Sequence, residues 1–185
     1  GGLALVALAS ARPEPIPTNA EMSSVNPVVL FPAALAARGA ALGKAYVGSL
    51  ALGAGQFCTN PGIVFALEGK DLDSFCNAAA DALAGQAAQT MLTPGIHTAY
   101  QKGVAAIAGH GKAAKLGEGA ASDGPNQGRA VIFQTTAAAF AACPELGDEI
   151  FGAASIVVAC ASMAELHAAI AAMEGNLDTP LAVNE

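Results

Sequence analysis

The stretch Gly55-Gln56-Phe57-Cys58-Thr59-Asn60-Pro61-Gly62 decides how the rest of the chain is interpreted. A long apolar segment leads up to it, and a β-like run (IVFAL, residues 63–67) follows it. Because proline and glycine interrupt regular structure, we predict a tight loop between two regular elements. Loops on a rigid scaffold often carry reactive side chains, and a cysteine thiol is a nucleophile when it is partly ionised. Cys58 is therefore a candidate nucleophile.

The other three cysteines have the surroundings of small buried residues. Cys76 falls in a helical pattern, and Cys160 ends the apolar run SIVVAC. A free cysteine is most often a buried hydrophobe, and Cys143 also fits that description. The flanks of Cys58 contain glycine, glutamine, asparagine and proline, which offer little to bury it. From these flanks alone, both a catalytic and a structural role remain open for Cys58.

The composition narrows the class of protein. The 185 residues fit one domain with a substantial core, since 54% are hydrophobic and 12% charged. The net charge of -7 and eight scattered basic residues argue against a nucleic-acid partner. We predict no membrane span, because Arg38 and Lys44 interrupt the apolar segment 33–54. The cysteines lack metal-ligand spacing, so we expect no metal and a reduced, cytoplasmic setting.

Strand and helix patterns alternate along the chain, which predicts an α/β fold with a mostly parallel sheet. The predicted strands cover residues 28–31, 62–67, 113–116, 130–135 and 154–160, and the predicted helices cover residues 1–11, 32–52, 70–89, 94–108, 137–142 and 162–173. Thr93 and Ser162 are predicted to cap two of the helices, and Gly175 to close the last one. Residues 15–21 are expected to be extended, and residues 118–128 to form an exposed loop.

Two further stretches accompany the cysteine loop. They are Ala20-Glu21-Met22-Ser23-Ser24-Val25-Asn26-Pro27 and Glu145-Leu146-Gly147-Asp148-Glu149-Ile150-Phe151-Gly152. Together with residues 55–62, they resemble, in the same order, the general-base glutamate motif, the catalytic cysteine motif and the second glutamate motif of the aldehyde dehydrogenase superfamily. The resemblance extends from Gly1 to about Leu177 and implies a three-layer α/β/α catalytic domain.

The resemblance implies oxidation of an aldehyde to a carboxylic acid. Cys58 would attack the carbonyl carbon, a thioester would follow, and Glu21 would act as the base that activates water. The backbone N–H of Cys58 would serve as one oxyanion donor. Phe57 and Thr59 would border the aldehyde substrate.

The cofactor implied by the resemblance is NAD or NADP. Glu149 would accept hydrogen bonds from the nicotinamide ribose, and Phe151 and Met22 would lie beside the nicotinamide. The family usually has paired glycines where this chain has Ser23 and Ser24. With the cysteine motif, these serines are most similar to the branch of α-ketoglutarate semialdehyde (2,5-dioxopentanoate) and NADP-dependent fatty aldehyde dehydrogenases.

The resemblance also implies a domain arrangement. Residues 1–26 would be the end of a cofactor-binding domain, and residues 27–185 would be the catalytic domain. The main dinucleotide-binding domain would lie outside this chain, so the isolated chain is expected to be inactive. Family members assemble as homo-oligomers, either dimers or tetramers, and no nucleic-acid or membrane partner is implied.

Two other kinds of function are considered beside this one. The first is a cysteine-dependent hydrolase or acyltransferase, which would need a histidine near Cys58. His97, His110 and His167 show no such spacing in the sequence. The second is a non-catalytic scaffold domain, which burial of Cys58 without an adjacent pocket would favour.

Overall fold

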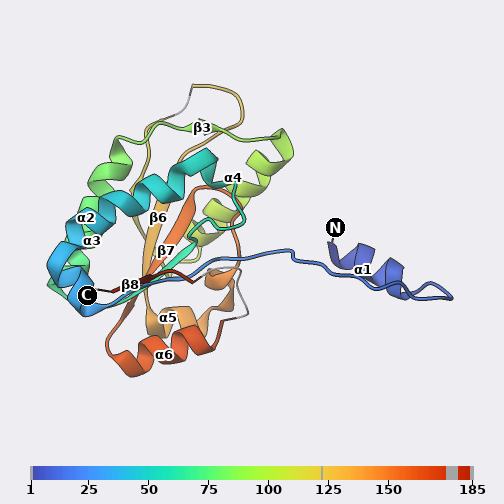
Figure 1. The fold of residues 1–185 in the computed structure, drawn as a ribbon. Coiled ribbons are helices and arrows are strands. Elements are labelled where there is room, and N and C mark those ends of the chain that lie inside the picture. Colours follow the sequence, from blue (N-terminus) through green and yellow to red (C-terminus); the bar gives the residue numbers. More distant parts are fainter. Residues whose placement is uncertain (1, 122, 174–178, 184–185) are drawn as a thin grey trace.

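A six-stranded sheet forms the centre of the computed structural model, which describes residues 2–121, 123–173 and 179–183 (Figure 1). Its order is β4-β6-β7-β2-β1-β8, and all neighbouring strands are parallel except the antiparallel pair β4 and β6. The strands are β1 (Val28–Leu30), β2 (Ile63–Leu67), β4 (Ala114–Glu118), β6 (Val131–Thr136), β7 (Ala154–Cys160) and β8 (Leu181–Ala182). The mostly parallel α/β fold predicted from the sequence is therefore confirmed.

Helices cover both faces of this sheet, which gives the predicted three layers. On one face lie α2 (Pro32–Ala51) and α3 (Lys70–Ala84), whose Leu50 and Phe75 are fully buried. On the other face lie α4 (Pro94–Gly109), α5 (Ala137–Ala142) and α6 (Met163–Ala171), which pack around Phe65 and Phe133. Strands β2 and β7 are buried along nearly their whole length, as expected for a parallel sheet covered on both sides.

The two helices on the first face approach closely because α2 presents glycines to α3. A Cβ added at Gly43 would collide with the carbonyl oxygen of Phe75 and lie 3.0 Å from the amide of Ala79. A Cβ added at Gly39 would lie 3.0 Å from the carbonyl oxygen of Asp71. These glycines therefore set the spacing of the layer that carries the helix leading to the cysteine loop.

The predicted helix starts agree with the structure, and one predicted end does not. Thr93 and Ser162 cap α4 and α6, with their side chains accepting from the backbone amides of Ile96 and Glu165. The prediction that the third helix reaches Gln89 is wrong, because α3 ends at Ala84. The following residues instead form β3 (Gln89–Thr90), which pairs with β5 (Gln127–Gly128) at the end of the predicted loop. Gly175 lies outside the described residues.

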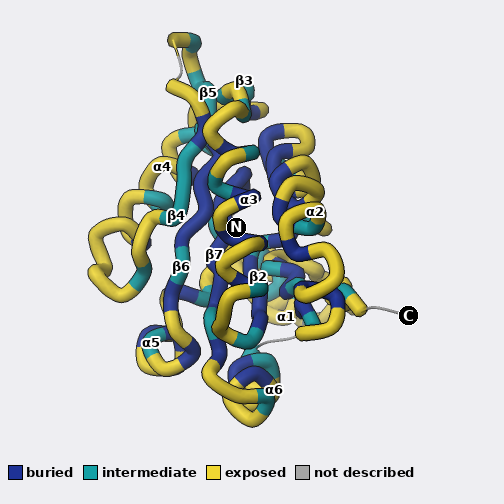
Figure 2. Tube along the Cα trace, turned by 90° about the vertical axis from the view of Figure 1, so that its left-hand side faces the viewer, coloured by how far each residue is buried: buried dark blue, intermediate teal, exposed yellow. Residues whose placement is uncertain are grey.

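Helix α1 (Gly2–Ser10) stands apart from the layered body at the end of an extended segment (Figure 1). None of its described residues is buried, although three of them are of intermediate exposure. Figure 2 shows that buried residues gather instead in the strands of the central sheet. Leu3, Leu5 and Leu8 are each more than 60% exposed, so this helix presents an apolar surface to solvent. Across the described residues, no helix combines the length and apolar character needed to cross a membrane.

Candidate active site

The three motif segments meet because each precedes one of three adjacent parallel strands. Residues 21–27 lead into β1, residues 55–62 into β2 and residues 148–153 into β7. The pairings Val28 with Val64 and Ile63 with Ile156 place the amino ends of these strands side by side. The candidate site therefore lies at the amino end of the sheet, although open parallel sheets more often bind ligands at the carboxyl end.

The cysteine loop is a rigid turn that presents Cys58 to solvent. Helix α2 ends in the 3-10 turn η1 (Leu52–Gly55), where Gly53, Ala54 and Gly55 all have positive φ angles. The side chain of Gln89 fixes this turn, since its Nε2 donates to Ala51 O (2.7 Å) and its Oε1 accepts from Ala54 N (3.1 Å). Cys58 follows in the open part of the loop and is exposed, as a nucleophile must be.

Two asparagines join the three segments. Asn26 Nδ2 donates to the carbonyl oxygens of Cys58 (2.8 Å) and Asn60 (2.9 Å), which links the first segment to the second. Asn60 Nδ2 donates to Gly152 O (3.0 Å), which links the second segment to the third. Gly62 N also donates to Val25 O (2.8 Å). The loop that carries Cys58 is thus held from both neighbouring strands.

The two motif glutamates lie near one another. Partial burial raises the pKa of the Glu149 carboxyl, the backbone N–H of Ser24 lowers it, and the negative charge of Glu21 raises it further. The Ser24 hydrogen bond joins the first and third segments at Glu149, while the two carboxylates repel each other. Glu21 itself is exposed.

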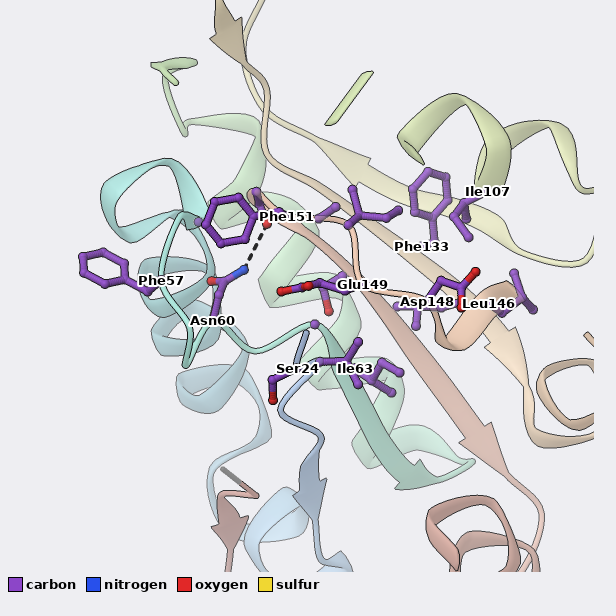
Figure 3. Close-up of a pocket in the computed structure, with 18 residues that line it drawn as sticks. Ser24, Phe57, Asn60, Ile63, Ile107, Phe133, Leu146, Asp148, Glu149 and Phe151 are labelled. Atoms are coloured by element: carbon purple, nitrogen blue, oxygen red, sulfur yellow. Dashed lines mark hydrogen bonds between the residues drawn. The ribbon is translucent and has the colours of Figure 1, made fainter. Parts of the chain in front are cut away.

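A pocket opens between the three segments (Figure 3). The residues that line it include Ser24, Phe57, Asn60, Glu149 and Phe151, together with apolar residues such as Ile63, Ile107, Phe133 and Leu146. Glu149 also borders a second cavity of about 530 Å³ between residues 23–25, α5 and α6. Glu149 therefore lines both cavities, and its exposed carboxylate offers acceptor oxygens to a ligand.

The remaining predicted site residues are placed around this pocket with different exposures. Phe57 is 48% exposed, and its ring lies over Gly53. Phe151 is 41% exposed, and Figure 3 shows it on the same side of the pocket as Asn60. Met22 is 50% exposed, and its side chain lies against Gly2 of α1. Cys58, Thr59 and Glu21 are exposed on these segments without lining the pocket.

Histidines and metal ligands are not part of this arrangement. His97 lies in α4, His110 follows it and His167 lies in α6, and none of the three lines the pocket. Within the described residues, no group of three or more His, Cys, Asp or Glu side chains could hold a metal ion. The site therefore offers an exposed thiol, two neighbouring carboxylates and a partly apolar pocket.

Sequence reasoning missed the joining role of Asn26, Asn60 and Ser24. Ser24 is only 9% exposed, because its hydroxyl turns inward and donates to Asn26 Oδ1 (2.7 Å). One signal could have found the asparagines, since both occur in an Asn-Pro pair directly before a buried strand, NPVVLF at residues 26–31 and NPGIVF at residues 60–65.

Comparisons with known proteins agree with the fold and with the family resemblance of the sequence. No family model matches the chain. It is 49% identical over 181 residues to alpha-ketoglutaric semialdehyde dehydrogenase 2 of Azospirillum brasilense, covering 98% of this chain and 34% of that protein. It is 36% identical over 186 residues to alpha-ketoglutaric semialdehyde dehydrogenase of Acinetobacter baylyi, covering 100% of this chain and 35% of that protein. The chain thus spans about a third of the length of these curated relatives.

Solved structures support the fold. A NAD-dependent benzaldehyde dehydrogenase from Corynebacterium glutamicum superposes with a TM-score of 0.79 at 16% identity, covering 100% of this chain and 40% of that one. A methylmalonate-semialdehyde dehydrogenase from Oceanimonas doudoroffii superposes with a TM-score of 0.70 at 16% identity, covering 88% of this chain and 35% of that one. The chain belongs to the aldehyde dehydrogenase superfamily.

Proposed function

We propose that this chain supplies the nucleophile and the carboxylates of an NAD(P)-dependent aldehyde dehydrogenase, with Cys58 as the catalytic cysteine. The observation that carries the proposal is the meeting of all three motif segments at the amino ends of β1, β2 and β7. That meeting places an exposed thiol beside a pocket walled by Glu149 and Phe151. The exposure of Cys58 and the adjacent pocket argue against the scaffold alternative. All three histidines lie outside both the three motif segments and the pocket lining, which argues against the hydrolase alternative.

In the proposed reaction, the Cys58 sulfur forms a bond to the aldehyde carbon, and the carbonyl electrons move to oxygen. The backbone N–H of Cys58 stabilises that oxyanion, as donors aimed at developing charge do. A nicotinamide cofactor, which Glu149 and Phe151 would hold, would supply the acceptor for the hydride that this carbon loses, and Cys58 would then carry a thioester. A soft, strongly nucleophilic sulfur suits the first step and leaves readily in the last.

Glu21 is proposed as the base for the final step. It would remove a proton from water as the water oxygen attacks the thioester carbon, after which the C–S bond breaks and the carboxylic acid leaves. The electrostatic interaction of Glu21 with Glu149 supports this role, because it indicates that Glu21 lies near a residue that lines the pocket.

The residues around Glu149 fit a nicotinamide ribose. Ribose hydroxyls are donors, and the Glu149 carboxylate offers acceptor oxygens on the wall of the pocket. Phe151 presents an exposed ring from the same segment, against which the flat nicotinamide can pack. We assign Met22 to the same region through its backbone, since its side chain lies against Gly2. A glycine at this position would let the cofactor approach the backbone closely. Ser24 also leaves room for that approach, because its hydroxyl turns inward toward Asn26.

The substrate is proposed to be an aldehyde of the semialdehyde type, α-ketoglutarate semialdehyde by similarity to the two curated relatives. Phe57 and Thr59 flank Cys58 and would border the aldehyde. The residues that line the pocket include no lysine or arginine. Recognition of a substrate carboxylate would therefore depend on groups outside this pocket.

We further propose that residues 1–26 belong to the cofactor-binding domain and residues 27–185 to the catalytic domain of a homo-oligomer. The separate position and exposed leucines of α1 support that division, because an apolar helix of this kind needs a partner surface.

The test is NAD(P)H formation by the polypeptide that carries this chain, purified intact, with α-ketoglutarate semialdehyde or straight-chain aldehydes. We expect Cys58→Ser to abolish NAD(P)H formation and Cys76→Ser, at a buried cysteine, to retain it. Glu21→Gln should slow thioester hydrolysis more than thioester formation. Cys58-dependent ester hydrolysis without NAD(P)H formation from any aldehyde would instead support the hydrolase alternative.

A further inference from the structure

Asn26 is a buried polar residue whose hydrogen-bonding groups are directed at the cysteine loop. It is 1% exposed, and its backbone has a φ of 45°, a left-handed conformation that few residues other than glycine and asparagine adopt. Both carboxamide hydrogens are used, one on Cys58 O and one on Asn60 O, and the carboxamide oxygen accepts from Ser24. A buried carboxamide satisfied in this way fixes the direction of the carbonyls that it binds.

The bond to Cys58 O determines where the next amide points. In a trans peptide the C=O and the N–H lie on opposite sides, and no cis peptide occurs in the described chain. Since Asn26 holds the Cys58 carbonyl toward the interior, the Thr59 N–H of the same peptide points outward. Cys58 itself is exposed to solvent.

We propose that Asn26 is a positioning residue that orients the Cys58–Thr59 peptide so that the Thr59 N–H acts as an oxyanion donor beside the nucleophile. This inference rests on the proposed role of Cys58. Asn26 touches neither substrate nor cofactor in this proposal, and it acts only through the peptide that it holds. Ser24 supports it by donating to the Asn26 carboxamide oxygen while its own backbone N–H binds Glu149.

Two reactions of Cys58 separate this role from a merely structural one. With iodoacetamide, the thiolate displaces iodide from a methylene carbon, and no oxyanion forms. With 4-nitrophenyl acetate, the thiolate bonds to the carbonyl carbon, negative charge develops on the carbonyl oxygen, and the C–O bond then breaks to release 4-nitrophenolate. Only the second reaction needs a placed N–H donor. Neither reaction requires the cofactor or an aldehyde.

The experiment compares both rates at Cys58, followed by peptide mass spectrometry, in the unmodified chain and in Asn26→Gly. Glycine removes the carboxamide and tolerates the positive φ. The matched control is Asn126→Gly, since Asn126 also has a positive φ (55°) and lies in the loop before β5. We expect Asn26→Gly to slow acylation about tenfold or more, below the full loss of an oxyanion donor, with alkylation changed less than about twofold. Asn126→Gly should leave both rates unchanged.

A parallel fall in both rates, or no change in acylation, would overturn the proposal. If Asn26→Gly does not fold, Ser24→Ala decides, because it removes the hydrogen bond to Asn26 Oδ1 and leaves the Asn26 side chain in place. A selective loss of acylation in Ser24→Ala supports the positioning role, and equal effects on both reactions reject it. Failure of the proposed function is a separate result, since it would show as absent NAD(P)H formation in the intact polypeptide.

Discussion

Substituting Gly55 by alanine tests whether the cysteine loop and the second glutamate segment are packed as closely as the structure indicates. Gly55 has a φ of 68°, and a Cβ there would collide with Gly152 C and Ala153 N. Gly111 provides a matched control, because its φ is 70° and an added Cβ would meet nothing within 4 Å. The two alanine variants therefore carry the same backbone strain and differ in the collision alone.

The magnitudes follow from these two contributions. A non-glycine residue in the left-handed region costs about 1–2 kcal/mol, which is the whole loss of unfolding free energy expected for Gly111→Ala. The collision at Gly55 is with backbone atoms that cannot rotate away, and overpacking of this kind costs about a further 1–3 kcal/mol. Gly55→Ala should therefore lose about 2–5 kcal/mol in total.

Urea denaturation of the two variants and the unmodified chain measures this difference. Hydrogen exchange followed by mass spectrometry would show where the collision acts, with faster exchange in peptides that cover residues 55–62 and 148–153 for Gly55→Ala only. Equal stability losses in the two variants would refute the close packing of these segments, because the backbone strain common to both would then explain everything.

Three further outcomes are expected from the same structure. Gly43→Ala should destabilise the chain by about 1–3 kcal/mol in thermal unfolding, because the added Cβ would meet the backbone of Phe75 in α3. Gly48→Ala is its control. The space there is open, so alanine should stabilise the helix by up to about 1 kcal/mol. Because the pKa of Glu149 is raised, the folded state binds the Glu149 proton more tightly than the unfolded state does. The contribution of Glu149 to stability is therefore fully present below pH 4 to 5, and it is lost as the pH rises through the folded pKa. Glu149→Gln should accordingly remove that part of the pH dependence of the melting temperature, and an unchanged profile would contradict the burial argument. Tyr100→Phe should lower the unfolding free energy by about 1–3 kcal/mol in urea, because it removes the hydroxyl that donates to Arg129 O, whereas Ala153 O still accepts from Val131 N.

Much of the fold could be predicted because local signals and burial agree along the chain. The continuous apolar run of β7 and the capping side chains of Thr93 and Ser162 mark their elements without knowledge of the rest. The end of α3 could not be found in this way. Gln89 leaves the helical pattern to pair with Gly128 and to bind the turn η1, and both partners are distant in the sequence.

The reactive groups of the candidate site are assigned from motifs and stay predictions, whereas the residues that support them were missed. Cys58, Glu21 and Glu149 are recognisable from motifs, whereas Asn26 and Asn60 look like ordinary turn residues before proline. Their importance comes from hydrogen bonds that span 32 and 92 residues, which only the strand order brings together. Sequence patterns predict elements well, and they say little about which loops meet at the end of a sheet.

The position of β7 in the sheet has a consequence for how this chain acquires its structure. β7 is the last long strand in the sequence, and it is inserted between β2 and β6, which do not pair with each other. Until residues 154–160 emerge and dock, the earlier strands of this six-stranded sheet can form only two separate groups, β1 with β2 and β4 with β6. Contacts that close such long loops slow folding, so the insertion of β7 should limit its rate. During synthesis, the loop that carries Cys58 would therefore lack the neighbouring Glu149 segment until β7 fills the centre of the sheet.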